Sequence, residues 1–341
     1  MVRCIRILVN VKVTSHDVAR LAGVSQPTVS RALRNLPGTS QETRAKVLAA
    51  ARELAYIPSE TGRSLSTRTT RRVAVVAEEL TNPFYPELVE PLRLNLSRHG
   101  FRTVLITDHV DDPVEVEALA DGSFDGVVLT TALRGSPVPR ALRERRIPHV
   151  LANRTVDEPG SSSASTDNRH GAALVADLLA SLGHKRIGAV FGPTATSTGR
   201  ERASGLRERL RRHGIGLDRD LVRRVPFTHE AGAAAAADLL AARHPPTAIA
   251  CGNDVVATGV LSAARARGIR VPEELTVIGF DDISLASWDI VSLTTVRCDL
   301  ASLARVAVEL LARRIAAPDS AVSCPVLAPS LVLRGTHARC R

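Results

Sequence analysis

The sequence has no run of apolar residues long enough to span a bilayer. Its start, MVRCIRILVNVKVT, places a short apolar run between basic residues and has no small-residue cleavage site, so it predicts an N-terminal arm (residues 1–12) rather than a signal peptide. The five cysteines are odd in number, scattered and without C-x-x-C spacing. We therefore expect reduced, buried thiols in a cytoplasmic protein, with no disulfide framework and no zinc site.

Motifs of catalysis and cofactor binding are also missing. No G-x-G-x-x-G follows an expected strand, and the glycines of GPTATSTGRE have six residues between them, which is not phosphate-loop spacing. Neither G-x-S-x-G nor H-E-x-x-H occurs. The ten histidines lack metal-ligand spacing, and we expect His170 and His184 at helix surfaces or caps. The sequence therefore predicts no metal, no cofactor and no enzymatic activity.

Positive charge is present but unevenly distributed. The formal net charge is +10, and residues 1–72 contain 13 Lys or Arg against four acids, which leaves about +1 for the rest of the chain. A basic head on a near-neutral body favours a polyanionic partner, whose binding would be driven by counterion release. A membrane surface would attract the same charge, but no stretch combines that charge with a large apolar helical face.

Residues 13–33, VTSHDVARLAGVSQPTVSRAL, show two short helical patterns separated by a Gly-Val-Ser turn. Thr14 and Asp17 form a capping box at the start of the first helix. Gly23 can end that helix in a left-handed conformation, and Ser25 is the expected N-cap of the second helix. This arrangement predicts a helix-turn-helix, although an ordinary helical hairpin with a solvated polar face fits the pattern alone.

The second helix of this pair, residues 26–33, has two unlike faces. Val29, Ala32 and Leu33 form the apolar face. The opposite face carries a long amide, two hydroxyls and a guanidinium, which suit base edges and phosphates better than a protein core. These groups belong to Gln26, Thr28, Ser30 and Arg31. The second helix is therefore the expected recognition helix.

A third helix and a linker follow. After a Pro-Gly turn, Thr39 and Glu42 form a second capping box, whose helix would complete an all-α domain of residues 13–58. Residues 59–72, SETGRSLSTRTTRR, are polar and basic with one large apolar residue, Leu65. This segment fits a flexible linker, and it also fits a short hinge helix that forms on a partner and inserts Leu65 into it.

From residue 73 to 341 apolar strands alternate with helices. Near-continuous apolar strands of this kind predict parallel sheets with helices on both faces. The expected strands are 73–80, 103–108, 126–131, 149–153, 186–192, 247–253 and 275–282. These units exceed one sheet, and the polar stretch 158–168 lies midway. We therefore expect two α/β subdomains divided there, with a ligand outside the carboxyl ends of the strands.

Polar side chains follow most of the expected strands. Each could be a helix cap, but together they could converge on a cleft that binds a small polar or polyhydroxylated solute. They are Asn82, Asn153, Arg154, Arg202, Asn253, Asp254, Asp281 and Asp282, with Phe84 beside them. Aromatic residues make up 3% of the chain, so few can stack on a pyranose ring. A nucleoside therefore stays open beside a sugar.

The chain from about Val13 to Thr336 resembles the lac repressor family of bacterial transcription regulators. VTSHDVARLAGVSQPTVSRAL and TSQETRAKVLAAARELAYIPS match the family's DNA-binding signature. NPFY, NDVVATGVL, VIGFDD and SLTTVRCDL match its core domain, which is similar to periplasmic sugar-binding proteins. The resemblance implies a homodimeric repressor that binds double-stranded operator DNA, and whose operator affinity changes when a small effector, a sugar or a nucleoside, binds between its two α/β subdomains.

The resemblance also implies roles for individual residues. Gln26, Pro27 and Arg31 fall on base-reading positions, and Leu65 falls on the leucine that inserts into the minor groove. The full set expected to contact DNA is Thr14, Ser25, Gln26, Pro27, Thr28, Ser30, Arg31, Arg63 and Leu65. The set expected to contact the effector is Phe84, Arg202, Asn253, Asp281 and Trp288.

Several positions depart from the family pattern. Gly62 stands where the hinge helix usually has alanine, which costs about 1 kcal/mol of helix propensity. Asn153 replaces a common aspartate, and Val291 replaces a usual proline. No heptad tail is present, so we expect a dimer rather than a tetramer. A solute-binding protein and a sugar- or nucleoside-acting α/β enzyme are alternatives that account for the body but leave residues 13–66 unexplained.

Overall fold

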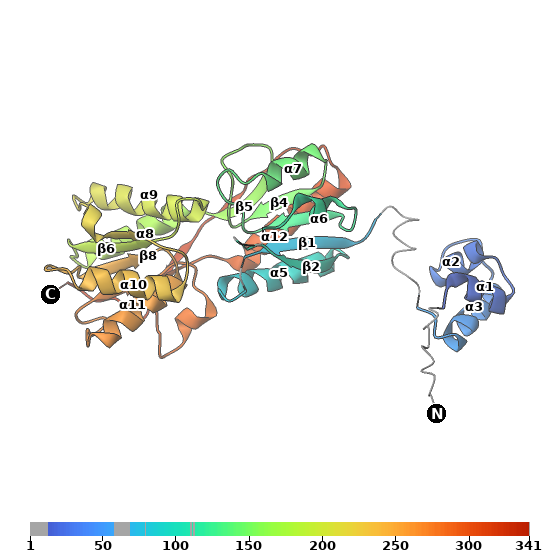
Figure 1. The fold of residues 1–341 in the computed structure, drawn as a ribbon, viewed down its shortest axis with the longest axis horizontal. Helices are drawn as coiled ribbons and strands as arrows, with labels where there is room; N and C mark the ends of the chain where they lie inside the picture. Colours follow the sequence, from blue (N-terminus) through green and yellow to red (C-terminus); the bar gives the residue numbers. More distant parts are fainter. Residues whose placement is uncertain (1–12, 58–68, 79, 110, 112, 341) are drawn as a thin grey trace, which may run out of the picture. The chain divides into compact units, whose positions relative to one another are not determined.

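The computed structural model describes residues 13–57, 69–78, 80–109, 111 and 113–340. The chain divides into two compact units, Met1–Thr70 and Arg71–Arg341, named here the head and the body. Figure 1 shows the elements of each unit. Across the described ranges, no helix combines the length and apolar character needed to cross a membrane.

Short helices with one apolar side each build the head. The helices described there are α1 (Ser15–Ala22), α2 (Gln26–Leu33) and α3 (Gln41–Glu53). Val18, Val29 and Val47, one from each helix, are fully buried against one another and against small alanines. Gly23 ends α1 with a φ of 66°, in the left-handed region that glycine adopts without steric cost. The predicted bounds of the second helix are confirmed.

The start of α3 differs from the prediction. Ser40, not Thr39, is the N-cap, and its Oγ accepts a hydrogen bond of 3.1 Å from the Thr43 amide. The Thr39 hydroxyl instead donates to the Leu36 carbonyl at 3.3 Å, within the preceding turn. Because the helix begins one residue later than expected, Glu42 is not at the position that closes a capping box with Thr39. The predicted second capping box is therefore wrong.

One parallel sheet of the body has the strand order β11-β5-β4-β3-β1-β2. Its strands are β1 (Arg72–Ala77), β2 (Arg102–Thr107), β3 (Gly126–Leu129), β4 (His149–Ala152), β5 (Ser162–Thr166) and β11 (Val326–Leu327). Its helices are α5 (Phe84–Arg98), α6 (Val116–Ala120), α7 (Val138–Glu144) and α12 (Leu300–Ala316). We name this layer assembly the first subdomain.

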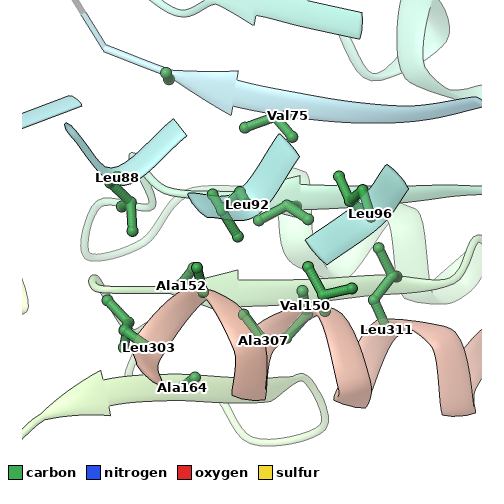
Figure 2. Packing of buried hydrophobic residues seen from close by; sticks show 14 of the residues in the cluster. Val75, Leu88, Leu92, Leu96, Val150, Ala152, Ala164, Leu303, Ala307 and Leu311 are labelled. Atoms are coloured by element: carbon green, nitrogen blue, oxygen red, sulfur yellow. The ribbon is translucent and has the colours of Figure 1, made fainter. Parts of the chain in front are cut away.

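Both faces of this sheet are buried. Along β1, Val73 and Val75 point to the core shared with α5 and α12, whereas Ala74 and Val76 point to the core on the opposite face. Figure 2 shows Leu92 of α5 and Leu311 of α12 over the same sheet face. A strand with two buried faces needs apolar residues at consecutive positions, which is why the run VAVVA is nearly continuous.

A second subdomain holds a parallel sheet of order β7-β6-β8-β9 and an antiparallel pair, β10 with β12. The strands are β6 (Ile187–Phe191), β7 (Val222–Arg224), β8 (Ala248–Cys251), β9 (Thr276–Ile278), β10 (Thr295–Arg297) and β12 (Ser330–Val332). The helices are α8 (Asn168–Ser181), α9 (Ser197–Arg212), α10 (His229–Leu240) and α11 (Asp254–Ala266), with the short turns η1 (Arg219–Leu221) and η2 (Ser284–Ser287). The predicted fold class, parallel α/β in two subdomains, is confirmed.

The division between the subdomains is not a single point in the sequence. Within the described residues the chain crosses between them after β5, before α12 and after β11. The polar stretch 158–168 was expected to be a boundary, yet residues 162–166 form β5, which pairs with β4 and with β11. Serine and threonine pack there because α12, from far along the chain, covers the strand. Local pattern cannot reveal such a partner.

Candidate functional site

The recognition helix presents a polar surface outside the head's core. Val29 and Ala32 are buried, whereas Ser25, Pro27 and Arg31 are exposed. Of three further residues predicted to contact DNA, Thr14 is exposed, and Thr28 and Ser30 of α2 are half-buried. The helix thus keeps its apolar stripe inward and offers hydroxyls and a guanidinium outward, the groups that duplex edges and phosphates accept.

Hydrogen bonds organise the polar groups at these helix starts. The Thr14 amide and hydroxyl both donate to the Asp17 carboxylate, at 3.0 and 2.8 Å, and these bonds hold the pKa of Asp17 below its usual range. The Gln26 Nε2 donates to the Ser15 hydroxyl at 3.3 Å and ties α2 to α1. Ser25 occupies the N-cap position as predicted, but its hydroxyl bonds the Thr28 hydroxyl at 2.8 Å rather than a backbone amide.

In the body, a cavity lies between the two subdomains, where strands of both sheets end. It holds about 20 Å³ that a water-sized sphere can occupy. Seven of its lining residues were singled out from the sequence because they follow expected strands. These are Asn82, Phe84, Asn153, Arg154, Arg202, Asn253 and Asp281. The parallel topology brings them together because the carboxyl ends of parallel strands share one edge of a sheet.

A buried ion pair forms one wall of this cavity. The Arg202 Nη2 donates to Asp281 Oδ1 at 2.8 Å, and the two side chains are 4% and 5% exposed. The same guanidinium donates from Nε to Asn168 Oδ1 at 2.8 Å and from Nη1 to the Gly252 carbonyl at 2.7 Å. Its carbon lies 3.8 Å from the centre of the Phe280 ring. Arg202 is therefore held rigidly in place before any ligand binds.

The Asp281 carboxylate is placed by a strained backbone. Its φ is 115°, in a region that costs a non-glycine residue on the order of 1–3 kcal/mol. The strain is held by the Asp281 amide, which donates to the Val296 carbonyl at 2.8 Å. Burial raises the pKa of Asp281, and the Arg202 guanidinium opposes that rise. An acid–guanidinium pair in this setting offers both an acceptor and donors to ligand hydroxyls.

Neighbouring acids and amides take different roles. Asn253 caps α11, since its Oδ1 accepts from the Val256 amide at 2.9 Å, and it also lines the cavity. Asp254 is fully buried and accepts from the Ile283 amide at 3.0 Å, so it belongs to the core. Asp282 binds Arg297 and Arg334, each at 2.6 Å, away from the cavity. Of the strand-end aspartates, Asp281 is the one that faces the ligand space.

A second arginine lines the opposite side of the cavity. Arg154 is 4% exposed, and its Nη2 donates to Glu78 Oε2 at 2.6 Å. The Tyr85 hydroxyl donates to the same carboxylate oxygen. Burial raises the pKa of Tyr85, so the phenol keeps its proton and acts as a donor. Each cavity arginine thus has its own carboxylate partner, and the charges around the cavity balance.

Three of the chain's nine aromatic residues line this cavity. Phe84, Tyr85 and Phe227 line it, and the first two pack edge to face with their ring centres 5.5 Å apart. The Asn82 Nδ2 donates to the Phe227 carbonyl at 3.3 Å, from the first subdomain to the second. The cavity therefore combines apolar ring faces with hydroxyl-binding groups, as small-molecule sites commonly do.

Comparison with known proteins gives a family for the head and one for the body. Residues 14–59 match the family "Bacterial regulatory proteins, lacI family", and residues 176–337 match the family "Periplasmic binding protein-like domain". The HTH-type transcriptional repressor CytR of Escherichia coli K12 is 34% identical over 331 residues, which cover 95% of this chain and 96% of the relative. The chain belongs to the lacI family of bacterial regulatory proteins. It is therefore a DNA-binding transcriptional regulator.

Solved structures of other lacI-family proteins share the fold. The complex of the transcriptional regulator CelR with cellobiose has a TM-score of 0.73 and 32% identity, and covers 95% of this chain and 99% of its own. The lac repressor dimer bound to operator and the anti-inducer ONPF has a TM-score of 0.84 and 26% identity, and covers 96% and 99%. Both extend over the head and the body.

Some of the expected site residues are not found among the described residues of either site. Arg63 and Leu65 lie outside the described residues, as does Gly62. Trp288, expected at the effector cavity, does not line it: the indole is 57% exposed at the end of η2. The extended backbone at Trp288 carries the side chain to the surface, and Phe84, Tyr85 and Phe227 supply the apolar wall instead.

Other sequence expectations for this lacI-family chain are also corrected. His184 is 3% exposed rather than on a helix surface: its Nε2 donates to the Ala338 carbonyl at 3.0 Å, since the chain's end covers it. Cys251 and Cys298 are buried as expected, and burial raises the pKa of Cys298 to about 12, but Cys324 is exposed. No cluster of potential metal ligands occurs within the part of the chain that the structure describes.

Three cavity residues of this lacI-family chain were missed in the sequence. Tyr85 stands beside Phe84 in the NPFY motif, so the motif itself was the available signal. Thr198 lies in the first turn of α9, four residues before Arg202, on the same helix face. Phe227 follows β7, whose sequence, VRR, has no apolar alternation to mark a strand. For Phe227 no local signal existed.

Proposed function

We propose that this chain is a repressor that binds its operator as a homodimer, and that a small neutral, polyhydroxylated effector in the body's cavity changes operator affinity. The observation that carries the proposal is the joint presence of a recognition helix with an outward polar face and a cavity lined by hydroxyl-binding groups. A regulator with a sensor needs both parts, and their coupling is a difference in effector affinity between two arrangements of the body.

On the DNA side, the proposal assigns base-edge contacts to Gln26, Pro27 and Arg31. Arg31 is exposed, and within the described ranges no carboxylate pairs with it, so its guanidinium is available for a bidentate contact with guanine. The surrounding hydroxyls, with the flanking basic residues, are assigned to phosphate and groove contacts that fix the register of the helix. Those hydroxyls belong to Thr14, Ser25, Thr28 and Ser30.

The effector class follows from the charge and size of the cavity. Arg202 pairs with Asp281 and Arg154 with Glu78, so a ligand that carried its own charge would leave a buried charge unpaired. In this arrangement the cavity holds about 20 Å³ that a water-sized sphere can occupy, far below the roughly 300–1,000 Å³ of most small-molecule sites, so its walls must separate to admit a ligand, which favours a small one. A neutral sugar of one ring leaves both ion pairs intact and matches the aromatic and hydroxyl-binding lining. A nucleoside is the alternative that the same lining allows.

Coupling requires that the subdomains move relative to each other when the effector binds. The subdomains are also in contact outside the cavity lining: the Asp157 carboxylate accepts from Arg134 at 2.6 Å and from Arg200 of α9 at 2.7 Å. The Glu87 carboxylate of α5 accepts from the Ser284 amide at 3.0 Å. An effector that contacts both sides, through Arg154 and Arg202, would shift the balance between this arrangement and one with a wider cavity.

A homodimer is supported by exposed apolar residues on the body. Leu94 of α5 and Leu105 of the edge strand β2 are 42% and 39% exposed, and Ile290 is 84% exposed. An exposed edge strand with an outward aliphatic group is a surface that a second copy of the chain can cover. Two copies of the chain would present two recognition helices to a pseudo-palindromic operator. Because its partner is bacterial operator DNA, we place the regulator in the cytoplasm, and the proposal assigns it no catalytic activity.

Operator binding measured with and without candidate effectors tests the proposal. A promoter fragment selected by the purified full-length chain would be titrated by fluorescence anisotropy at fixed salt, alone and with neutral monosaccharides and ribonucleosides. We expect at least one compound to shift operator affinity in the unaltered chain and not in Asp281→Asn. A chain that prefers no duplex over competitor DNA would contradict the regulator, and turnover of a bound compound would instead support the enzyme alternative.

A further inference from the structure

A second hollow of the body lies in the first subdomain, at the carboxyl ends of β1, β2 and β3. It holds about 520 Å³ that a water-sized sphere can occupy, against about 20 Å³ in the effector cavity. Its lining is mainly apolar and includes Val114, Val116, Leu129, Leu133 and Val138. We name it the outer chamber. Apart from Arg154, its lining residues differ from those of the effector cavity.

One side chain borders both spaces. Arg154 lines the effector cavity and the outer chamber, Tyr85 stands on the cavity side, and Glu78 and Thr131 stand on the chamber side. The Arg154 Nη2 donates to Glu78 Oε2 at 2.6 Å, and its Nη1 donates to the Thr131 carbonyl at 3.4 Å. The guanidinium carbon lies 5.9 Å from the centre of the Tyr85 ring. The partition between the two spaces is thus an arginine held from both sides.

This partition is strong for a physical reason. Arg154 is 4% exposed, so moving its guanidinium away from Glu78 without a replacement partner would leave a buried charge unpaired. The Tyr85 hydroxyl adds a second donor to the same carboxylate oxygen and keeps Glu78 in place. A neutral or apolar substituent on an effector offers no carboxylate in exchange. Such a substituent therefore meets a closed wall, although ample space lies behind it.

We propose that the Arg154–Glu78 pair is a size filter: it restricts the effector to a single ring and excludes analogues that carry a bulky substituent toward the outer chamber. This inference rests on the proposed function and adds to it a specificity-determining residue, Arg154, and a substrate limit. Removing the guanidinium would join the two spaces. The joined space would admit a substituent into apolar surroundings that favour an aryl group.

The test compares ligands that differ only in size. The full-length chain is screened by thermal shift against neutral monosaccharides and ribonucleosides, and each sugar that stabilises it is then compared, by calorimetry, with its methyl and phenyl glycosides. We expect the phenyl glycoside to bind the unaltered chain at least about tenfold more weakly than the methyl glycoside, a typical discrimination for pocket fit. Equal or tighter binding of the phenyl glycoside would overturn the size filter.

Variants locate the filter. In Arg154→Ser the ratio of phenyl to methyl glycoside affinity should rise by at least about tenfold, because the wall is gone. Glu78→Gln keeps the shape of the wall and removes the charge that anchors Arg154, so it should raise the same ratio by a smaller factor even if Arg154→Ser fails to fold. Arg140→Ser removes an exposed arginine paired with Glu144 on α7 and should leave the ratio unchanged.

The outcomes distinguish failure of the proposed effector class from failure of the size filter. If no screened compound stabilises the unaltered chain, the proposed effector class fails and the size filter fails with it. If ribonucleosides stabilise the chain and monosaccharides do not, the effector has more than one ring and the size filter alone fails. If sugars bind but Glu78→Gln and a folded Arg154→Ser keep the unaltered affinity ratio, only the size filter fails. If the ratio rises in both and not in Arg140→Ser, Arg154 determines the size of the effector.

Discussion

The head and the body of this regulator bring their candidate binding residues together in different ways. In the head, the described residues assigned to DNA all lie between Thr14 and Arg31, within two short helices that are adjacent in sequence. In the body, the cavity residues come from positions as distant as Asn82 and Asp281, and they meet because two parallel sheets end there. A local surface tolerates loss of a single contact, whereas a buried assembly of distant groups does not.

The largest expected effect tests that contrast in the body. Arg202→Ala leaves the Asp281 carboxylate buried without its cation, which should lower the free energy of unfolding of the body by about 3–5 kcal/mol. Trp288 is the chain's one tryptophan and lies in the body, so urea unfolding followed by its fluorescence reports this unit. The paired replacement Arg202→Met with Asp281→Leu should cost less. A loss below about 1 kcal/mol in Arg202→Ala would contradict the assembly argument.

A smaller effect is expected in the head, on binding rather than on stability. Arg31→Ala should weaken binding to the specific operator by about 1–3 kcal/mol, the value of one bidentate base contact, and leave effector binding unchanged. Arg34→Ala removes an equal charge just beyond the recognition helix and is the matched control. Arg34→Ala should lose affinity for the operator and for competitor DNA to the same extent. Equal specific losses in both variants would mean that Arg31 acts by charge alone.

The cap of α3 distinguishes two neighbouring residues by a still smaller amount. Ser40→Ala removes the oxygen that accepts from the Thr43 amide and should destabilise the head by about 1 kcal/mol. Thr39→Ala removes a 3.3 Å bond within a turn and should change stability by less than half of that. Hydrogen exchange of the α3 amides measures both. The reverse order would restore the capping box expected from the sequence.

The smallest expected effect is a pH dependence confined to the body. Burial lowers the pKa of His149 from its ordinary value of 6.5, while its hydrogen bond to the Ile147 carbonyl opposes this. The unfolded chain therefore takes up this proton at a higher pH than the folded chain, so stability is complete above pH 6.5 and falls as the pH drops below that value.

This contribution is measured from the free energy of unfolding of the unaltered chain and of His149→Gln between pH 7.5 and pH 5.5. The difference between the two slopes against pH should be roughly what the titration of one histidine supplies. The stability of the variant should fall less over this interval than that of the unaltered chain. His170→Gln, at an exposed position of α8, is the control and should keep the unaltered slope. Parallel pH profiles for all three chains would rule out His149 as the source.

The extent of prediction differed between the two regions for physical reasons. Gly23, Val29 and the bounds of α2 could be predicted because caps and apolar spacing act within one or two turns. Most strand-end polar residues could be identified because apolar runs mark buried strands. Phe227 could not be, since the edge strand before it lacks an apolar pattern, and Trp288 was misplaced because its neighbours in sequence do not determine where a loop points.

By itself, the sequence of this regulator determined its helix-turn-helix, its class of sheet and the residue types available at the strand ends, because those features depend on contacts within a few residues. Only the tertiary structure decided that Arg202 is paired with Asp281, that Arg154 is held by Glu78 against a second space, and that β5 belongs to the first sheet. The two residues of each ion pair are separated by 76 residues or more in the sequence. The strand β5 is covered by α12, which comes much later in the chain. Pairings of that kind form through the packing of whole layers, and no local pattern encodes them.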